Sequence, residues 1–142
     1  MKKTLTFDSI LGTVNLLKRA KLDKMKEGES FQVVKALRGL KSVVTPVQEL
    51  MDTAEEKLKP ENYDEMMVRA QKYASLTDDE KYELEAVIAT HRKRVNRCVN
   101  DELKKTTSIE ISPISEESFN RLCESNTFTA GEMMTLMDVL CK

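Results

Sequence analysis

The apolar residues of this chain recur with helical spacing over most of its length. The longest run alternates steps of four and three residues, and its members are Val33, Leu37, Leu40, Val44, Val47, Met51, Ala54 and Leu58. This heptad seam predicts one long helix with a single apolar face. A second long helix is predicted from the capping box at Thr77 to Glu80 as far as about Lys105. We expect these two helices to pack antiparallel as the spine of the fold.

Two stretches instead alternate polar and apolar residues, Thr4 to Phe7 and Ser108 to Ser112. An isolated strand leaves its backbone groups without partners, so we expect the two to pair with each other. The resulting ribbon would join the N-terminus to the C-terminal third. Shorter helices are expected after caps at Asp8, Ser115 and Thr129. The predicted fold class is therefore mostly α (α+β), a helical domain with a small two-stranded β-ribbon.

Composition agrees with this fold and narrows the class of protein. The chain has 142 residues, a formal net charge of −1, four glycines and three prolines, and no linker divides it, so we expect a single domain over residues 1–142. No run of about 20 apolar residues is present, so no contact with a membrane is expected. Three scattered cysteines do not form a disulfide framework. These features favour a cytoplasmic protein with reduced thiols.

The sequence offers little for catalysis or cofactor binding. His91 and Cys98 share a helix face but stand two turns apart, too far to bind one metal ion. The four glycines are isolated, so no phosphate-binding loop is formed. A pairing of His91 with another cysteine through the fold stays open, but no orienting group or oxyanion hole is evident. We therefore expect no enzymatic activity, no catalytic or metal-binding residues and no cofactor.

One basic run is a candidate for nucleic-acid binding. It consists of Arg92, Lys93, Arg94 and Arg97 on the second long helix. Phosphate contacts by such residues are the main source of affinity for nucleic acids. Acidic residues on the same helix offset the field, and no aromatic residue lies among the basic ones for base stacking. Nucleic-acid binding is therefore the alternative hypothesis, and a solvated or protein-binding face is the first.

Two apolar features are candidates for protein binding. The first is the centre of the heptad seam, with Leu37, Leu40, Val44, Val47 and Met51. The second is the C-terminal segment, where Met133, Met134 and Met137 accompany Leu136 and Leu140. One helix face cannot hold all of these side chains, so part of the segment is expected to meet a partner or a second side of the core. For the C-terminal segment, core packing is the first interpretation and a partner groove is the second. For the seam, an antiparallel partner helix in the same chain is the simpler interpretation and self-association is the alternative.

The layout resembles a family of short uncharacterised bacteriophage and prophage proteins. The resemblance rests on the strand at Thr4 to Phe7, the basic segment Lys35 to Arg38, the helix end at Glu55 to Leu58 and the late Ile109 to Ile111 strand. It implies a phage gene product that acts by binding in the host cytoplasm, and it implies no enzymatic residues. The segment Pro60 to Ser75 departs from the family layout as a lengthened insertion.

The function expected from the sequence is that of a non-catalytic interaction protein, a phage or prophage accessory or assembly factor. It would bind a protein partner or itself through helical apolar surfaces. A helical nucleic-acid-binding or regulatory protein is the first alternative. A small-molecule-binding protein, such as an anti-defence factor with a site assembled only by the fold, is the second.

Overall fold

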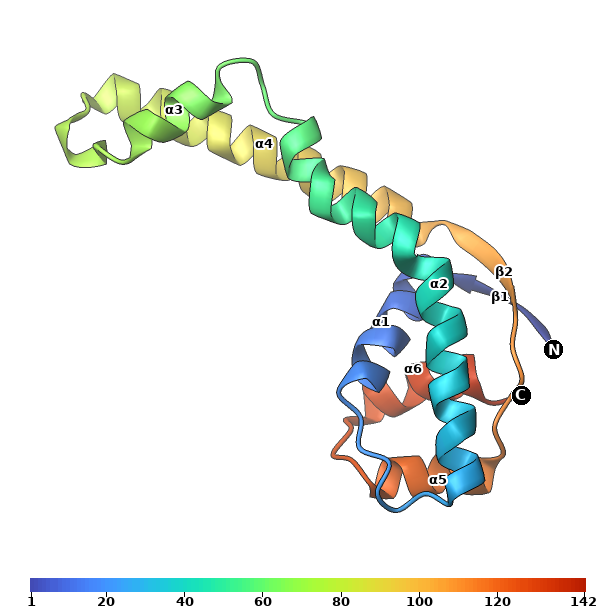
Figure 1. The fold of residues 1–142 in the computed structure, drawn as a ribbon. Helices are drawn as coiled ribbons and strands as arrows, with labels where there is room; N and C mark the ends of the chain where they lie inside the picture. Colours follow the sequence, from blue (N-terminus) through green and yellow to red (C-terminus); the bar gives the residue numbers. More distant parts are fainter. The chain divides into compact units, whose positions relative to one another are not determined.

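The computed structural model describes the whole chain, residues 1–142. Its elements follow in the order β1 (Lys2–Thr6), α1 (Phe7–Lys18), α2 (Glu27–Lys57), α3 (Tyr63–Ala70), the 3₁₀ turn η1 (Tyr73–Ser75), α4 (Asp78–Lys104), β2 (Thr106–Glu110), α5 (Glu116–Glu124) and α6 (Ala130–Leu140) (Figure 1). The predicted fold class is confirmed, since the chain is mostly helical with one two-stranded ribbon. The two long helices are α2 and α4. No helix combines the length and the apolar character that crossing a bilayer requires.

The chain forms two compact units where the sequence suggested one domain. The terminal unit comprises Met1–Val47 and Leu103–Lys142, and the middle unit comprises Gln48–Glu102. The boundary between the units falls inside α2 and inside α4. Because both helices continue across it, no linker composition marks the division in the sequence.

The predicted ribbon is present in the terminal unit. Strands β1 and β2 pair antiparallel, with Lys3 opposite Ile109 and Leu5 opposite Thr107. One further pair extends the ladder, because Met1 and Ile111 exchange two hydrogen bonds of 2.9 and 3.0 Å. The ribbon therefore ties the N-terminus to the C-terminal third, as expected.

The core of the terminal unit lies where α1 meets α5 and α6. Its innermost side chains, all essentially inaccessible to solvent, are Ile10, Val14, Leu122, Leu136, Val139 and Leu140. Helix α1 begins two residues earlier than the sequence suggested, because Thr6 and not Asp8 is its N-cap and accepts the Ser9 N–H at 3.1 Å. Asp8 lies in the first turn instead, where its charge suits the helix dipole.

The other predicted caps are confirmed. Ser115 caps α5 by accepting the Ser118 N–H at 3.1 Å. Thr129 and Glu132 form the complete capping box of α6. The same reciprocal pattern joins Thr77 and Glu80 at the start of α4. Each cap satisfies N–H groups that a helix end leaves without partners.

The middle unit is a helical hairpin, in which the C-terminal part of α2 runs antiparallel to α4 and α3 lies along α4 (Figure 1). Its buried side chains are Ala54, Tyr63, Leu84 and His91. The rings of Tyr63 and His91 lie in contact, with centroids 4.4 Å apart. Near the loop, the Tyr73 hydroxyl donates a hydrogen bond to Glu85. These contacts hold α3 and η1 against α4.

Candidate functional site

A groove of about 880 Å³ lies in the terminal unit between α2 and β2. One wall is the α2 stretch from Phe31 to Val43, and the other is the segment from Ser108 to Pro113. Ligand pockets in proteins commonly have volumes of roughly 300–1,000 Å³. The groove is therefore large enough to hold a bound segment of several residues.

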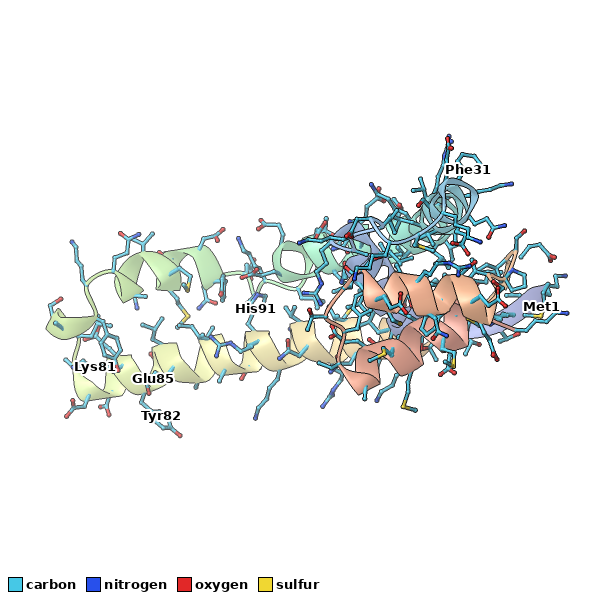
Figure 2. The ribbon with its side chains drawn as sticks, turned by 90° about the horizontal axis from the view of Figure 1, so that it is seen from below. Met1, Phe31, Lys81, Tyr82, Glu85 and His91 are labelled. Atoms are coloured by element: carbon cyan, nitrogen blue, oxygen red, sulfur yellow. The ribbon has the colours of Figure 1, made fainter.

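The helical wall combines an exposed aromatic ring with two cations. Phe31 is 67% exposed and lies at the protein surface (Figure 2). Lys35 and Arg38 follow it along the groove, are both exposed, and form no ion pair within the chain. Leu40, nearly inaccessible to solvent, lines the groove from the core side. This wall offers an apolar contact and a positive field to anything that enters the groove.

The strand wall presents backbone hydrogen-bonding groups. In an antiparallel pair, successive residues direct their N–H and C=O groups alternately toward the partner strand and away from it. Ile111 bonds to Met1, and the Lys105 carbonyl accepts the Phe7 N–H at 3.0 Å, so the odd-numbered residues of β2 face β1. Ser108 and Glu110 therefore direct their backbone groups to the outer edge of β2, and both residues line the groove.

The acidic residue of the groove has a partner of its own. The Met1 ammonium group forms an ion pair of 3.0 Å with the Glu110 carboxylate. Lys35 and Arg38 consequently keep their charges uncompensated, and the net field of the groove is positive.

The heptad seam is largely covered within the single chain. Leu40, Val44 and Val47 are buried, and Leu37 and Met51 are half-buried. Packing within the chain accounts for most of this apolar face. Among these five residues, the structure brings only Leu40 to the groove.

The C-terminal methionines divide between two environments. Helix α6 buries Leu136, Val139 and Leu140 and leaves Met134 68% and Met137 48% exposed. Met133 is half-buried. The exposed pair forms a small apolar surface on the side of α6 away from the core.

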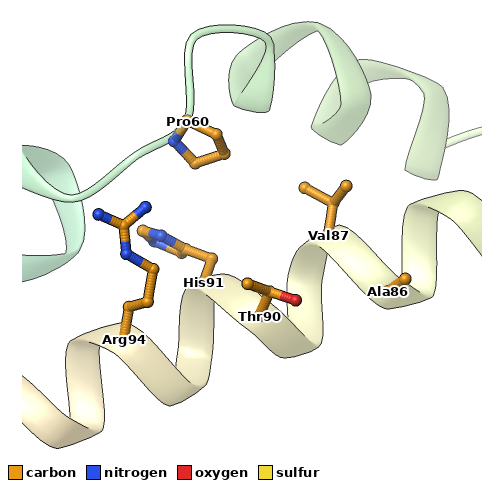
Figure 3. Close-up of a pocket in the computed structure, with 6 residues that line it drawn as sticks. All are labelled: Pro60, Ala86, Val87, Thr90, His91 and Arg94. Carbon is orange, nitrogen blue, oxygen red and sulfur yellow. The ribbon is translucent and has the colours of Figure 1, made fainter.

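The basic run lies in the middle unit and is fully at the surface. Arg92, Lys93, Arg94 and Arg97 are all exposed on α4. Arg94 also borders a small hollow of about 220 Å³ beside His91 and Pro60. In Figure 3 the Arg94 side chain extends from α4 toward the segment that carries Pro60, and the His91 ring lies below Pro60 and points toward Arg94.

His91 is a core histidine, but its environment differs from the one expected. The side chain is only 4% exposed. Buried polar atoms are usually hydrogen-bonded, but neither Nδ1 nor Nε2 of His91 has a partner. The ring is held by its contact with Tyr63 instead.

No group of three or more histidine, cysteine or acidic residues is arranged to hold a metal ion. Burial raises the pKa of the thiols of Cys123 and Cys141. A raised pKa lowers the fraction of thiolate at neutral pH, and the thiolate is the nucleophilic form.

Comparison with known proteins adds no assignment: no protein-family model, no curated protein and no solved structure matches the chain. The resemblance to bacteriophage proteins stays a prediction.

The groove itself was missed by reasoning from the sequence. Two signals in the sequence bear on it. Phe31 and Val34 fall outside the heptad seam, and both are more than half exposed. Ser108 to Ser112 was recognised as a strand, but a strand of a two-stranded ribbon always has one unpaired edge.

Proposed function

We propose that this chain is a non-catalytic interaction protein that binds a protein partner in the groove between α2 and β2. The observation that supports it best is the combination, in one groove, of the exposed Phe31 ring, two unpaired cations and the free edge of β2. Aromatic and arginine side chains are enriched among the residues that contribute most to binding at protein interfaces. The raised pKa values of the thiols of Cys123 and Cys141 give no support to catalysis by a thiolate.

The groove is a better candidate than the two surfaces expected from the sequence. The heptad seam is mostly covered by the chain's own packing. The methionine pair Met134 and Met137 is exposed, but it carries no charge and no free backbone edge that would select a partner. A single protein partner that touches the groove would account for all three of its features.

Site-specific photo-crosslinking tests this function. We would place a benzoylphenylalanine at Phe31, and as matched controls at Met134 in the same unit and at Tyr82 in the middle unit, all three exposed. We expect one protein to be captured from position 31 in the cells that make this chain, and not from position 82.

Capture from position 134 alone would move the docking surface to the methionine pair. Capture of nucleic acid, or no capture above the level at position 82, would contradict the proposal.

A further inference from the structure

We infer that the groove accepts an extended acidic segment of the partner, which pairs with the outer edge of β2 as a third strand. This inference rests on the proposed function and names the chemistry of the partner. Three observations carry it: the direction of the β2 backbone groups, the shape of the groove beside them, and the charge of its helical wall.

The outer edge of β2 has backbone groups that could pair with another strand. Ser108 and Glu110 direct N–H and C=O groups outward, and these groups form no backbone hydrogen bond within the chain. An extended peptide that lies along this edge would exchange hydrogen bonds with both residues. Such main-chain bonds supply affinity to any extended chain, so the side chains in the groove must supply the selection.

The groove continues the edge of β2 beyond the ribbon. Its strand wall extends from Ser108 to Pro113, whereas β2 itself ends at Glu110. The next even-numbered residue after Ser112 is Ile114, whose N–H already donates to the Leu140 carbonyl at 2.9 Å, so the free edge ends before it. A paired segment of about five residues thus fits between Thr106 and Pro113.

Charge selects the partner's side chains. Lys35 and Arg38 line the wall opposite the strand edge without an ion pair, while Glu110 is neutralised by the Met1 ammonium group. Carboxylates on the incoming segment would form ion pairs with these two cations, and Arg38 could hold a carboxylate with two parallel hydrogen bonds. In a strand, alternate residues face the same side, so acidic residues would alternate with apolar ones, and an apolar side chain is expected on Phe31.

A second copy of this chain fits the groove less well. Strand β1 carries Lys2, which would bring a like charge toward Lys35 and Arg38, while its neighbour Lys3 donates to the carbonyls of Asp138 and Cys141 in its own chain. Strand β2 carries a single carboxylate, Glu110, which is already paired with Met1. Charge therefore favours a partner with acidic residues over self-pairing.

Fluorescence anisotropy with defined peptides tests the inference on the full chain. The probe is a labelled ten-residue peptide in which valine and glutamate alternate. Its matched controls carry lysine in place of glutamate, or methyl groups on alternate backbone amides that remove the hydrogen-bond donors. We expect binding of the glutamate peptide, with affinity weaker by about tenfold or more for either control, the loss typical of one or two hydrogen bonds or charge pairs.

Two protein variants locate the binding. Ser108→Pro removes an outward N–H and leaves the backbone hydrogen bonds between β2 and β1 in place, although the 3.3 Å contact of the Ser108 hydroxyl with Thr4 is lost. We expect it to weaken binding of the glutamate peptide by about tenfold. The double variant Lys35→Glu with Arg38→Glu should reverse the preference, so that the lysine peptide binds better. Lys93→Glu with Arg97→Glu makes the same charge change in the middle unit and should leave binding unchanged.

Equal binding of the methylated peptide overturns strand pairing, even where Ser108→Pro fails to fold. No peptide binding at millimolar concentration overturns the inference, and so does a dimer that Ser108→Pro converts to a monomer. Capture of a protein from position 31 together with failure of all peptides would leave the proposed function in place and remove only strand pairing. Failure of the capture would remove the function itself.

Discussion

Arg121 holds the carboxylate of Glu29 with two parallel hydrogen bonds, from Nε to Oε1 at 2.7 Å and from Nη2 to Oε2 at 2.5 Å. The Ser118 hydroxyl donates a third, to Oε2, at 2.6 Å. These bonds fasten the first turn of α2 to α5. The start of α2 also leads directly to Phe31, so the same contacts position one end of the groove.

This arrangement predicts a specific loss of stability in acid. The hydrogen bonds from Arg121, then from Ser118, lower the pKa of Glu29 from 4.5 to about 2. A carboxyl whose pKa is lower in the folded state stabilises the fold at pH values above the unfolded pKa, and this contribution is lost as the pH falls through the folded value. Urea denaturation should therefore show that Glu29→Gln lowers the unfolding midpoint at pH 7, and that its difference from the wild type shrinks between about pH 4.5 and pH 2.

Glu27→Gln is the matched control, because Glu27 lies in the same helix turn, is exposed and forms no ion pair. Its unfolding midpoint should follow the wild type over the whole pH range. A difference between Glu29→Gln and the wild type that stays constant down to pH 2 would contradict the role given to the Arg121 pair.

The success of reasoning from the sequence depended on how local each interaction is. The capping boxes at Thr77 and Thr129 were evident because their partners stand three residues away. The ribbon was evident because only two stretches alternate, so each had one possible partner. The Glu29–Arg121 pair joins residues 92 positions apart, and nothing in either neighbourhood marks it.

The groove could not be predicted from the sequence, because it too depends on residues that are far apart in the chain. It exists only because the chain returns from α4 through β2 beside a helix that ended more than forty residues earlier. The expected binding residues of the seam were chosen by their apolar spacing. That spacing is the signature of core packing as much as of an interface, and the fold used Leu40, Val44 and Val47 for its core.

Helix α6 gives a direct test of how its apolar residues divide between core and surface. Leu136 is fully buried, so Leu136→Ala should lower the free energy of unfolding by about 2–5 kcal/mol through lost contacts and a residual cavity. Met134→Ala, an exposed position on the same helix, should change it by less than about 0.5 kcal/mol. Chemical denaturation of both variants measures the contrast. A large cost at Met134 would show that its side chain packs in the folded protein.

The basic run on α4 provides a test of the alternative function. Arg92, Arg94 and Arg97 are exposed, but we expect no complex with duplex or single-stranded nucleic acid at physiological salt. Electrophoretic mobility shifts at several salt concentrations make the measurement, with the triple alanine variant of these arginines as the control. Binding that weakens steeply with salt and disappears in the triple variant would replace protein binding by nucleic-acid binding as the leading function.

The strongest prediction for the middle unit concerns His91. Its two ring nitrogens are buried without hydrogen-bond partners, an arrangement that typically costs about 1–3 kcal/mol for each unsatisfied polar group. His91→Leu removes the polar atoms, keeps an apolar side chain against Tyr63, and should raise the free energy of unfolding of the middle unit by about 1 kcal/mol. His91→Gln, which keeps a polar side chain at the same place, should not stabilise it.

Hydrogen exchange of the α4 amides measures both variants, since slower exchange reports a more stable helix. Faster exchange in His91→Leu than in His91→Gln would show that the imidazole nitrogens do have a binding partner in solution, and that the hollow beside Arg94 and Pro60 is where to look for it.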